Sequence, residues 1–320
     1  MACVAVYAAV GFAVEGGEAA RQGLPSLVRP WLLVPVLLMA PANYLLRFIK
    51  WQAYTRRLGF HQVPWRGNLV VFLSGMGLTL TPGKVGELVK SWLLWDRYGV
   101  PSARSAPMVF ADRLTDGCAM LALASVGAVL LGRGSIPWSL IAAVVVLVLL
   151  VRSRRVMLAF VDLLARIPRL RAARSKLHEL LDSAQTLLEP GIFAYAFGLG
   201  LVGWGLEGLL IFLVLGAFGH AFPVGASLLV VASSAIAGGV SPMPGGIGAA
   251  EAVMVALLLW LKVPLGLAVV TTIITRFATL WLGVAIGLVA LGWSGGGGAR
   301  GGVVPAAPAE DPQEAGALRP

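Results

Sequence analysis

The sequence predicts an all-α, polytopic helical membrane protein with two inverted repeats, each containing a broken re-entrant hairpin. The first supporting observation is composition: the 320 residues are 58% hydrophobic and 12% charged, with a mean hydropathy of +0.86. A soluble domain carries about 25% charged residues. The second is that apolar runs continue to residue 293. The third is that Pro-Gly interrupts two of these runs, at Pro82 and at Pro244.

The positions of the charges predict a membrane topology and no nucleic-acid partner, despite the net charge of +10. Eight of the 25 Lys and Arg residues lie between Arg152 and Lys176. Four more cluster after the second apolar run, namely Arg47, Lys50, Arg56 and Arg57. Cytoplasmic loops carry such an excess of Lys and Arg. We therefore expect a multi-pass protein of the cell (inner) membrane with its N- and C-termini in the cytoplasm.

Hydropathy orders the elements along a transmembrane domain covering residues 1–293. A short first helix is predicted at residues 1–14, below the roughly 20 residues that a span needs. The predicted spans are residues 31–49, 108–131, 136–151, 192–218 and 265–293. Residues 152–190 are basic and amphipathic, so we expect them at the cytoplasmic surface. Residues 294–320 are rich in Gly, Pro and Ala, which predicts a disordered tail.

Two pairs of short apolar runs flank the Pro-Gly breaks. Residues 68–80 and 85–95 are joined by Thr81-Pro82-Gly83, and residues 224–240 and 247–261 flank the second break. Proline removes a backbone donor, and lipid cannot satisfy the backbone groups that a break frees. Each break is therefore predicted to be a re-entrant hairpin whose helix ends lie in a protein-lined site.

The two hairpins have similar sequence surroundings. Arg113 follows Pro82 by 31 residues, and Arg276 follows Pro244 by 32. A threonine comes soon after each arginine, in Arg113-Leu-Thr115 and Arg276-Phe-Ala-Thr279. If residues 152–190 are cytoplasmic, the first hairpin enters from the inside and the second from the outside. Inverted repeats with broken helices are typical of secondary transporters.

Substrate-binding candidates are the polar residues at membrane depth and the half-helix starts. Half-helix N-termini favour anions such as phosphate, and Thr81 and Ser241 could cap them. Ionisable residues inside a membrane usually face a partner or a pathway. The candidates are Thr81, Gly83, Lys84, Glu87, Lys90, Asp112, Arg113, Asp116, Glu207, Ser241, Gly245, Gly246, Glu251 and Arg276.

Structural roles for the same charges stay open at this point. Asp112 and Asp116, four residues apart, could pair with Lys84 or Lys90 and lock the hairpin. Glu87 and Lys90 could form a local pair on the surface. Glu207, Glu251 and Arg276 are nearly the only charges between residues 191 and 293, which indicates a shared polar centre or a structural triad.

The sequence contains no known enzyme signature, and it predicts no cofactor and no metal site. It has neither a phosphate-binding loop nor a His-Glu-x-x-His motif. The glycines from Gly245 to Gly248 follow no strand, so they do not form a dinucleotide fingerprint. The two cysteines, Cys3 and Cys118, suggest neither a disulfide framework nor a metal site. An enzyme is therefore the less favoured interpretation.

Four motifs resemble the flippase-like family built on the transmembrane region of lysylphosphatidylglycerol synthase. They are Arg47-Phe-Ile-Lys-Trp51, Thr81-Pro-Gly-Lys-Val-Gly-Glu87, Asp112-Arg-Leu-Thr-Asp116, and Pro244-Gly-Gly-Ile-Gly248 with Glu251. The resemblance covers about residues 1–293. It implies a helical fold with re-entrant elements and a role in moving or handling anionic, aminoacylated or polyprenyl-linked lipids. The sequence has no counterpart of the synthase's soluble aminoacyl-transfer domain, so we do not expect lipid lysylation by this chain.

These observations favour a membrane lipid transporter that moves an anionic, aminoacylated or polyprenyl-type lipid between leaflets. Its expected partners are membrane lipids. An alternative stays open, in which the chain is a membrane-embedded or accessory subunit of a lipid-modifying or glycosyl-transfer enzyme. The sequence gives no oligomeric state.

Overall fold

The structure is a computed structural model of the whole chain, and it describes residues 30–81, 86–132 and 174–296, with short pieces between 142 and 159. Every regular element within these residues is a helix, as the sequence predicts. Several predicted features lie outside the described residues: the helix at 1–14, the residues Gly83 and Lys84, most of the span at 136–151, much of the segment 152–190, and the tail from residue 297 onwards.

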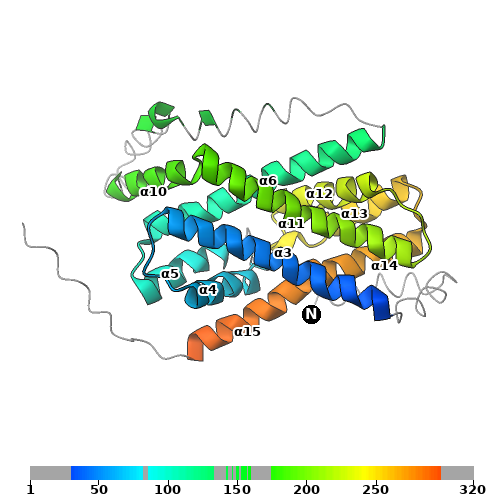
Figure 1. Cartoon of the computed structure of the whole chain (residues 1–320), viewed down its shortest axis with the longest axis horizontal. Coiled ribbons are helices and arrows are strands. Elements are labelled where there is room, and N and C mark those ends of the chain that lie inside the picture. The colour runs from blue at the N-terminus through cyan, green and yellow to red at the C-terminus, as the bar shows by residue number, and fades with distance from the viewer. Residues whose placement is uncertain are drawn as a thin grey trace, which may run out of the picture.

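The first half is a long helix, two short helices around a break, and a second long helix (Figure 1). The helices are α3 (Pro30–Arg57), α4 (Trp65–Gly77), α5 (Val89–Tyr98) and α6 (Ser102–Leu130). Pro64 and Pro101 precede α4 and α6 and set the extended backbone from which each helix starts. Gly99, with φ +64°, ends α5 in the left-handed conformation that glycine adopts most easily.

The second half repeats this order after α10. Its elements are α10 (Arg174–Leu187), α11 (Pro190–Ala217), α12 (Val224–Val240), the short 3-10 helix η2 (Pro244–Gly246), α13 (Ala249–Trp260), α14 (Leu265–Arg276), the π-helical turn η3 (Phe277–Trp281) and α15 (Leu282–Gly296). The last three form one continuous rod in Figure 1. Each half therefore places a broken pair of short helices between two long ones.

Three helical stretches among the described residues are long and apolar enough to cross a membrane: Ser102–Leu130, Pro190–Ala217 and Leu265–Trp293. Each coincides with a predicted span. The helices α12 and α13 are apolar but shorter. α10 buries Leu181, Ala184 and Leu187 on one face, so this part of the 152–190 segment has the predicted amphipathic pattern.

The two halves interlock through their short helices. α12 packs along α6, and α4 packs along α15, so each hairpin lies against a long helix of the other half. Glycines bring these backbones together: a Cβ on Gly127 would lie 2.5 Å from the Gly225 oxygen, and one on Gly77 would lie 2.6 Å from the Gly287 carbonyl carbon. α11 packs along α3 at the centre of the bundle (Figure 1). The halves thus form one body around a shared interior.

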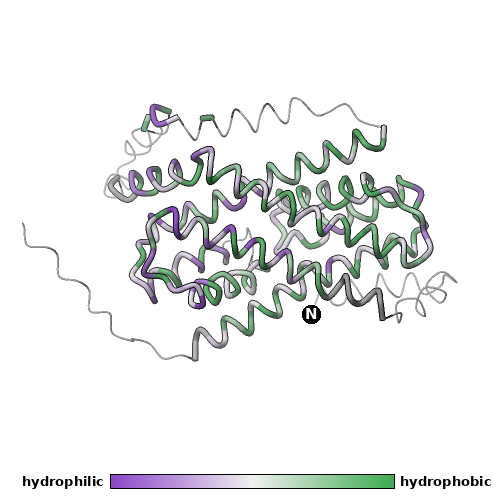
Figure 2. Tube along the Cα trace, in the orientation of Figure 1, coloured by the Kyte–Doolittle hydropathy of each residue, from purple (hydrophilic) through white to green (hydrophobic). Residues whose placement is uncertain are grey.

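Hydrophilic segments gather at one end of the bundle, where α3 ends, α6 begins and α10 lies (Figure 2). Arg56, Arg57 and Arg104 belong to these helix ends. The opposite end, where α12 and α13 lie, is largely hydrophobic in Figure 2. The described bundle is therefore polarised along its long axis.

Candidate functional site

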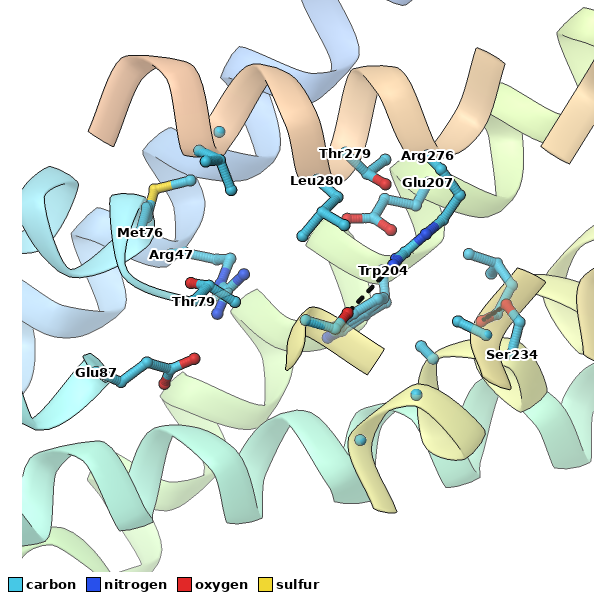
Figure 3. Close-up of a pocket in the computed structure, with 18 of the residues that line it drawn as sticks. Arg47, Met76, Thr79, Glu87, Trp204, Glu207, Ser234, Arg276, Thr279 and Leu280 are labelled. Atoms are coloured by element: carbon cyan, nitrogen blue, oxygen red, sulfur yellow. Dashed lines mark hydrogen bonds between the residues drawn. The ribbon is translucent and has the colours of Figure 1, made fainter. Parts of the chain in front are cut away.

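A cavity of about 120 Å³ lies where the two halves meet. This volume has room for several water molecules, because one water needs roughly 10–15 Å³ of such space. Six charged side chains from both halves line it: Arg47, Glu87, Lys90, Arg113, Glu207 and Arg276. Figure 3 shows Glu87 and Arg47 toward one side of this space and Glu207 and Arg276 toward the other.

The tips of the two broken hairpins meet beside this cavity. A Cβ on Gly245, in the second break, would lie 2.8 Å from Cδ2 of Leu80, in the first. Gly245 and Gly246 have φ values of +63° and +67°, in the left-handed region that favours glycine. A Cβ on Gly246 would also lie 2.5 Å from the Gly238 oxygen. The second break thus needs glycine both for its backbone angles and for its close packing.

Arg113 and Glu87 form the ion pair of the first half. Arg113 Nε donates to Glu87 Oε2 at 2.9 Å, and Arg113 Nη2 donates to Oε1 of the same carboxylate. Glu87 lies in the turn that precedes α5, and its side chain is buried. A bidentate bond of this kind fixes the direction as well as the distance of the guanidinium. The surface pair of Glu87 with Lys90 is therefore not the arrangement found.

Arg276 and Glu251 form the ion pair of the second half. Arg276 Nε donates to Glu251 Oε1 at 2.7 Å, and Arg276 Nη2 donates to the Gly245 oxygen at 3.2 Å (Figure 3). The other carboxylate oxygen of Glu251 accepts a hydrogen bond from the Gly248 N–H at 2.7 Å, which caps the start of α13. This pair therefore holds the turn of the second hairpin.

The two ion pairs occupy matching places in the two halves. Each joins an acidic residue just after a break to an arginine on the long helix that follows. The separation along the chain is 26 residues in the first half and 25 in the second. The similarity of the two breaks that the sequence indicates thus extends to their ion pairs.

Lys50 joins α3 to α6 through two carboxylates. Its Nζ lies 2.6 Å from Asp112 Oδ1 and 2.5 Å from Asp116 Oδ1, and all three side chains are buried. Lys50 is therefore a buried link between two helices and not an exposed loop charge. Because the register of α3 turns this residue toward α6, Lys50 is the closest described cation to both aspartates, and Arg47 Nη2 lies farther away, 3.8 Å from each. Lys90 instead lies over the Trp51 ring, 4.5 Å from its centroid.

Glu207 projects from the middle of α11 and lines the cavity. Its Oε1 accepts a hydrogen bond from Asn43 Nδ2 on α3, at 2.5 Å. Its side chain is 9% exposed. Glu207 and Arg276 both line the cavity. Glu251 does not line it but binds Arg276. The predicted polar centre of the second half is thus an ion pair with a separate acid beside it.

The remaining predicted residues surround the cavity without lining it. Thr81 Oγ1 accepts from the Gly86 N–H at 2.7 Å, across the first break. Ser241 Oγ accepts from the Met243 N–H at 3.1 Å, ahead of η2. Among the predicted residues that the structure describes, Glu87, Lys90, Arg113, Glu207, Gly245 and Arg276 line the cavity, and Thr81, Asp112, Asp116, Ser241, Gly246 and Glu251 do not.

Sequence reasoning missed several lining residues. Arg47 lines the cavity with a buried Nε that has no hydrogen-bond partner among the described residues. Thr275 also lines it, and its buried hydroxyl likewise has no described partner. A signal for Arg47 exists in its spacing of four residues from Asn43, which places both on one face of α3. Thr275 has no local signal, since threonine is common in apolar helices.

The lining charges suit an anionic group better than a metal ion. Four cationic side chains and two carboxylates line the cavity. Arginine donates in a fixed fork that matches phosphate and carboxylate oxygens. Within the described part of the chain, no group of three or more His, Cys, Asp or Glu side chains is placed to hold a metal.

Comparison with known proteins gives a family. The family described as lysylphosphatidylglycerol synthase TM region matches residues 1–287. A UPF0104 membrane protein of Methanothermobacter thermautotrophicus is 28% identical over 130 residues, which cover 39% of this chain and 37% of that protein. No solved structure matches this chain. The family match covers both hairpins, both ion pairs and nearly all of the described bundle, so the chain is a membrane protein that belongs to the lysylphosphatidylglycerol synthase TM region family.

Proposed function

We propose that this protein moves a lipid with an anionic headgroup between the two leaflets of the membrane. The observation that carries the proposal is the pair of matching Arg–Glu ion pairs, one from each half, beside a single cavity where the two breaks meet. Charged groups inside a membrane are costly and usually mark a pathway. Anionic phospholipids, aminoacylated lipids and polyprenyl-linked lipids all carry the phosphate that such a cavity suits.

The arrangement of the halves supports inverted repeats with re-entrant hairpins. In Figure 1, α4 and α5 lie toward the end where α3 ends and α6 begins, and α12 and α13 lie toward the opposite end. Their tips meet in between, as the contact of Leu80 with Gly245 requires. We propose that each hairpin enters the membrane from its own side. This is the arrangement that transporters use to expose one site alternately to both sides.

The headgroup is proposed to bind between the arginines. Arg113 and Arg276 are each oriented by a glutamate, while Arg47 presents a buried Nε without a described partner. Arginines held in this way lose little further side-chain entropy when a phosphate enters. The half-helix α13 starts at Ala249, and its second residue, Ala250, lines the cavity, so the N-terminus of this helix favours the same charge. Lys84 and Gly83, outside the described residues, are predicted to contribute the matching start in the first half.

The polarised bundle also supports an orientation. The end that carries Arg56, Arg57 and Arg104 is proposed to face the cytoplasm, because membrane proteins keep such residues inside. The end of α15 then lies on the cytoplasmic side, and Pro30, where α3 begins, lies on the opposite side. A cytoplasmic N-terminus, as the sequence predicts, therefore requires the segment before Pro30 to cross the membrane. Cysteine labelling from each side of intact cells, at an added surface cysteine on α10 and at one beside Lys262, tests this orientation.

The decisive test is a leaflet-accessibility assay in proteoliposomes. Trace fluorescent phosphatidylglycerol reports translocation by its exposure to a membrane-impermeant quencher. We expect the wild-type protein to exchange the lipid between leaflets. Arg113→Ala or Arg276→Ala should slow this exchange at least about tenfold, because losing a charged hydrogen bond costs about 1.4 kcal/mol or more. Arg56→Ala, an exposed arginine of α3, is the matched control. Normal exchange with both cavity variants contradicts the site.

A second candidate function is a membrane-embedded or accessory part of a lipid-modifying enzyme. The observation that favours it is Glu207, a cavity carboxylate that no arginine engages among the described residues, as a general base requires. Glu87 and Glu251 are less suited, because arginines hold both. Product analysis after incubation with lipid phosphates separates this function from transport, since transport leaves the lipid unchanged.

A further inference from the structure

The acidic side chains around the cavity fall into two classes. Four of them lie within ion-pair distance of a cation: Glu87 with Arg113, Asp112 and Asp116 with Lys50, and Glu251 with Arg276. Glu207 is different, because its described partner is the neutral amide of Asn43 and no Lys or Arg of the described chain lies within 4.0 Å of it. Glu207 is nevertheless buried, with 9% of its surface exposed, and lines the cavity.

The surroundings of Glu207 contain charges, but each is engaged elsewhere. On α3, Arg47 lies 3.8 Å from both Asp112 and Asp116, and the Tyr44 hydroxyl donates to the Ala278 oxygen. On α14, the Arg276 guanidinium binds Glu251 and the Gly245 oxygen. On α6, the facing acid is Asp116, bound to Lys50. α12 carries no titratable side chain.

We propose that Glu207 is a proton-binding site that couples the proton to the anionic ligand of the cavity. A buried carboxylate without a cation is costly as an ion, and taking up a proton removes that cost. The cavity supplies the route, because it has room for water beside the carboxylate. In this step a hydronium ion in the cavity transfers its proton to a carboxylate oxygen of Glu207 and becomes water. The Asn43 amide still donates to Oε1.

Binding of the proton and of an anion favour each other. Protonation of Glu207 removes one of the two negative charges that line the cavity. The remaining carboxylate is Glu87, which is paired with Arg113, one of the four cations of the lining. An incoming phosphate then meets less repulsion, and by thermodynamic linkage the phosphate equally favours the protonated acid. The proton and one negative charge would cross together without net charge movement. This coupled step rests on the proposed function, whereas the proton site itself does not.

Infrared difference spectroscopy tests the proton site without any lipid substrate. In wild-type protein in phosphatidylcholine vesicles, we expect a carbonyl band of a protonated carboxyl that disappears as the buffer is made alkaline. Glu207→Gln should lack this band, and Glu179→Gln, an exposed acid of α10, should keep it. Asn43→Leu removes the donor to the ionised form and should move the loss of the band to more alkaline buffer. A titration that is unchanged in both Glu207→Gln and Asn43→Leu overturns the proposal.

Transport of trace fluorescent phosphatidylglycerol in the same vesicles tests the coupling. With one proton per anionic lipid, an imposed difference of about one pH unit should shift the steady-state leaflet distribution about tenfold, independently of membrane potential. Glu207→Gln should abolish this response. Transport that ignores the gradient overturns the coupling and leaves the proposed function intact. A titrating Glu207 band without any transport supports the proton site and counts against the transport function for this lipid.

Discussion

The two halves of the molecule share a pattern but use their charges differently. In the first half, Arg113 and Glu87 form a bidentate pair next to the buried Lys50 cluster, which ties α3 to α6. In the second half, Arg276 divides its donors between Glu251 and the Gly245 oxygen. Charges in the first half thus fix helices to each other, whereas those in the second half fix the backbone of a turn.

This difference indicates which parts of the two halves can change conformation. Ion pairs between buried helices are hard to separate, because each partner left alone is an unpaired buried charge. The turn of the second hairpin depends on single hydrogen bonds to backbone atoms, and these can exchange for water in the cavity at small cost. We therefore expect the first half to act as the rigid side of the site and the second hairpin as the side that moves.

The largest effect is expected from Lys50→Met. This change removes the closest cation of the buried Asp112 and Asp116 and leaves them only Arg47, at 3.8 Å, so it should cost about 3 to 5 kcal/mol of stability. Thermal unfolding in detergent, followed by the fraction of protein that stays monodisperse, measures it. Arg56→Met, on the exposed face of the same helix, is the matched control and should change little.

A rescue sharpens this first test. Combining Lys50→Met with Asp112→Asn and Asp116→Asn removes the three buried charges and should recover most of the lost stability, because the remaining Arg47 side chain is 22% exposed. If the triple variant is no more stable than Lys50→Met alone, the cluster does not act as one electrostatic unit. Any difference in rigidity between the halves would then come only from the backbone contacts of the second hairpin.

The next effect compares the two glutamates of the ion pairs. Glu87→Gln weakens a bidentate, buried interaction and should cost about 1.5 to 3 kcal/mol. Glu251→Gln should cost less, because Gln keeps an acceptor for the Gly248 N–H and the side chain is more exposed, at 16% against 3%. Unfolding midpoints of the two variants in one detergent measure the difference. Equal losses contradict the idea that the first pair is the more rigid one.

Much of this architecture could be predicted from the sequence because its signals are local. Pro-Gly inside an apolar run marks a break wherever it occurs. The charged residues from Asp112 to Asp116, and Arg276 in the last span, stand out within long apolar helices. The burial of Lys50 could not be predicted in the same way. A lysine next to Arg47 at the end of an apolar run has the same sequence appearance as a cytoplasmic anchor, and only the packing of α3 on α6 decides which it is.

A smaller effect is expected at the turn of the second hairpin. Gly246→Ala forces a left-handed backbone on a residue with a Cβ and places that atom 2.5 Å from the Gly238 oxygen. The cost should be about 1 to 3 kcal/mol. Gly205→Ala on α11 has open space around its Cβ and should be neutral or slightly stabilising, which makes it the control. If Gly246→Ala unfolds at the wild-type temperature, the turn already relaxes freely.

The smallest effect is expected at the π-helical turn η3, which has no equivalent in the regular helix α6. The turn begins directly after Arg276, so it sets the direction in which the following residues face the cavity. Tyr44 on α3 donates its hydroxyl to the Ala278 oxygen at 2.7 Å, and also lies 3.2 Å from the Thr279 oxygen. Bulges of this type leave a carbonyl without its usual helical partner, and Tyr44 satisfies it here.

Tyr44→Phe should therefore cost about 0.5 to 1.5 kcal/mol and loosen the backbone of the second half only. Hydrogen exchange of the amides in residues 277–284 measures this loosening directly and should become faster. Tyr54→Phe is the matched control, because Tyr54 is a buried tyrosine of the same helix that bonds Thr115 of the first half at 3.1 Å. The control should lose comparable stability without faster exchange in residues 277–284. If both variants leave this exchange unchanged, the turn does not depend on the Tyr44 hydrogen bond and the two halves are equally rigid there.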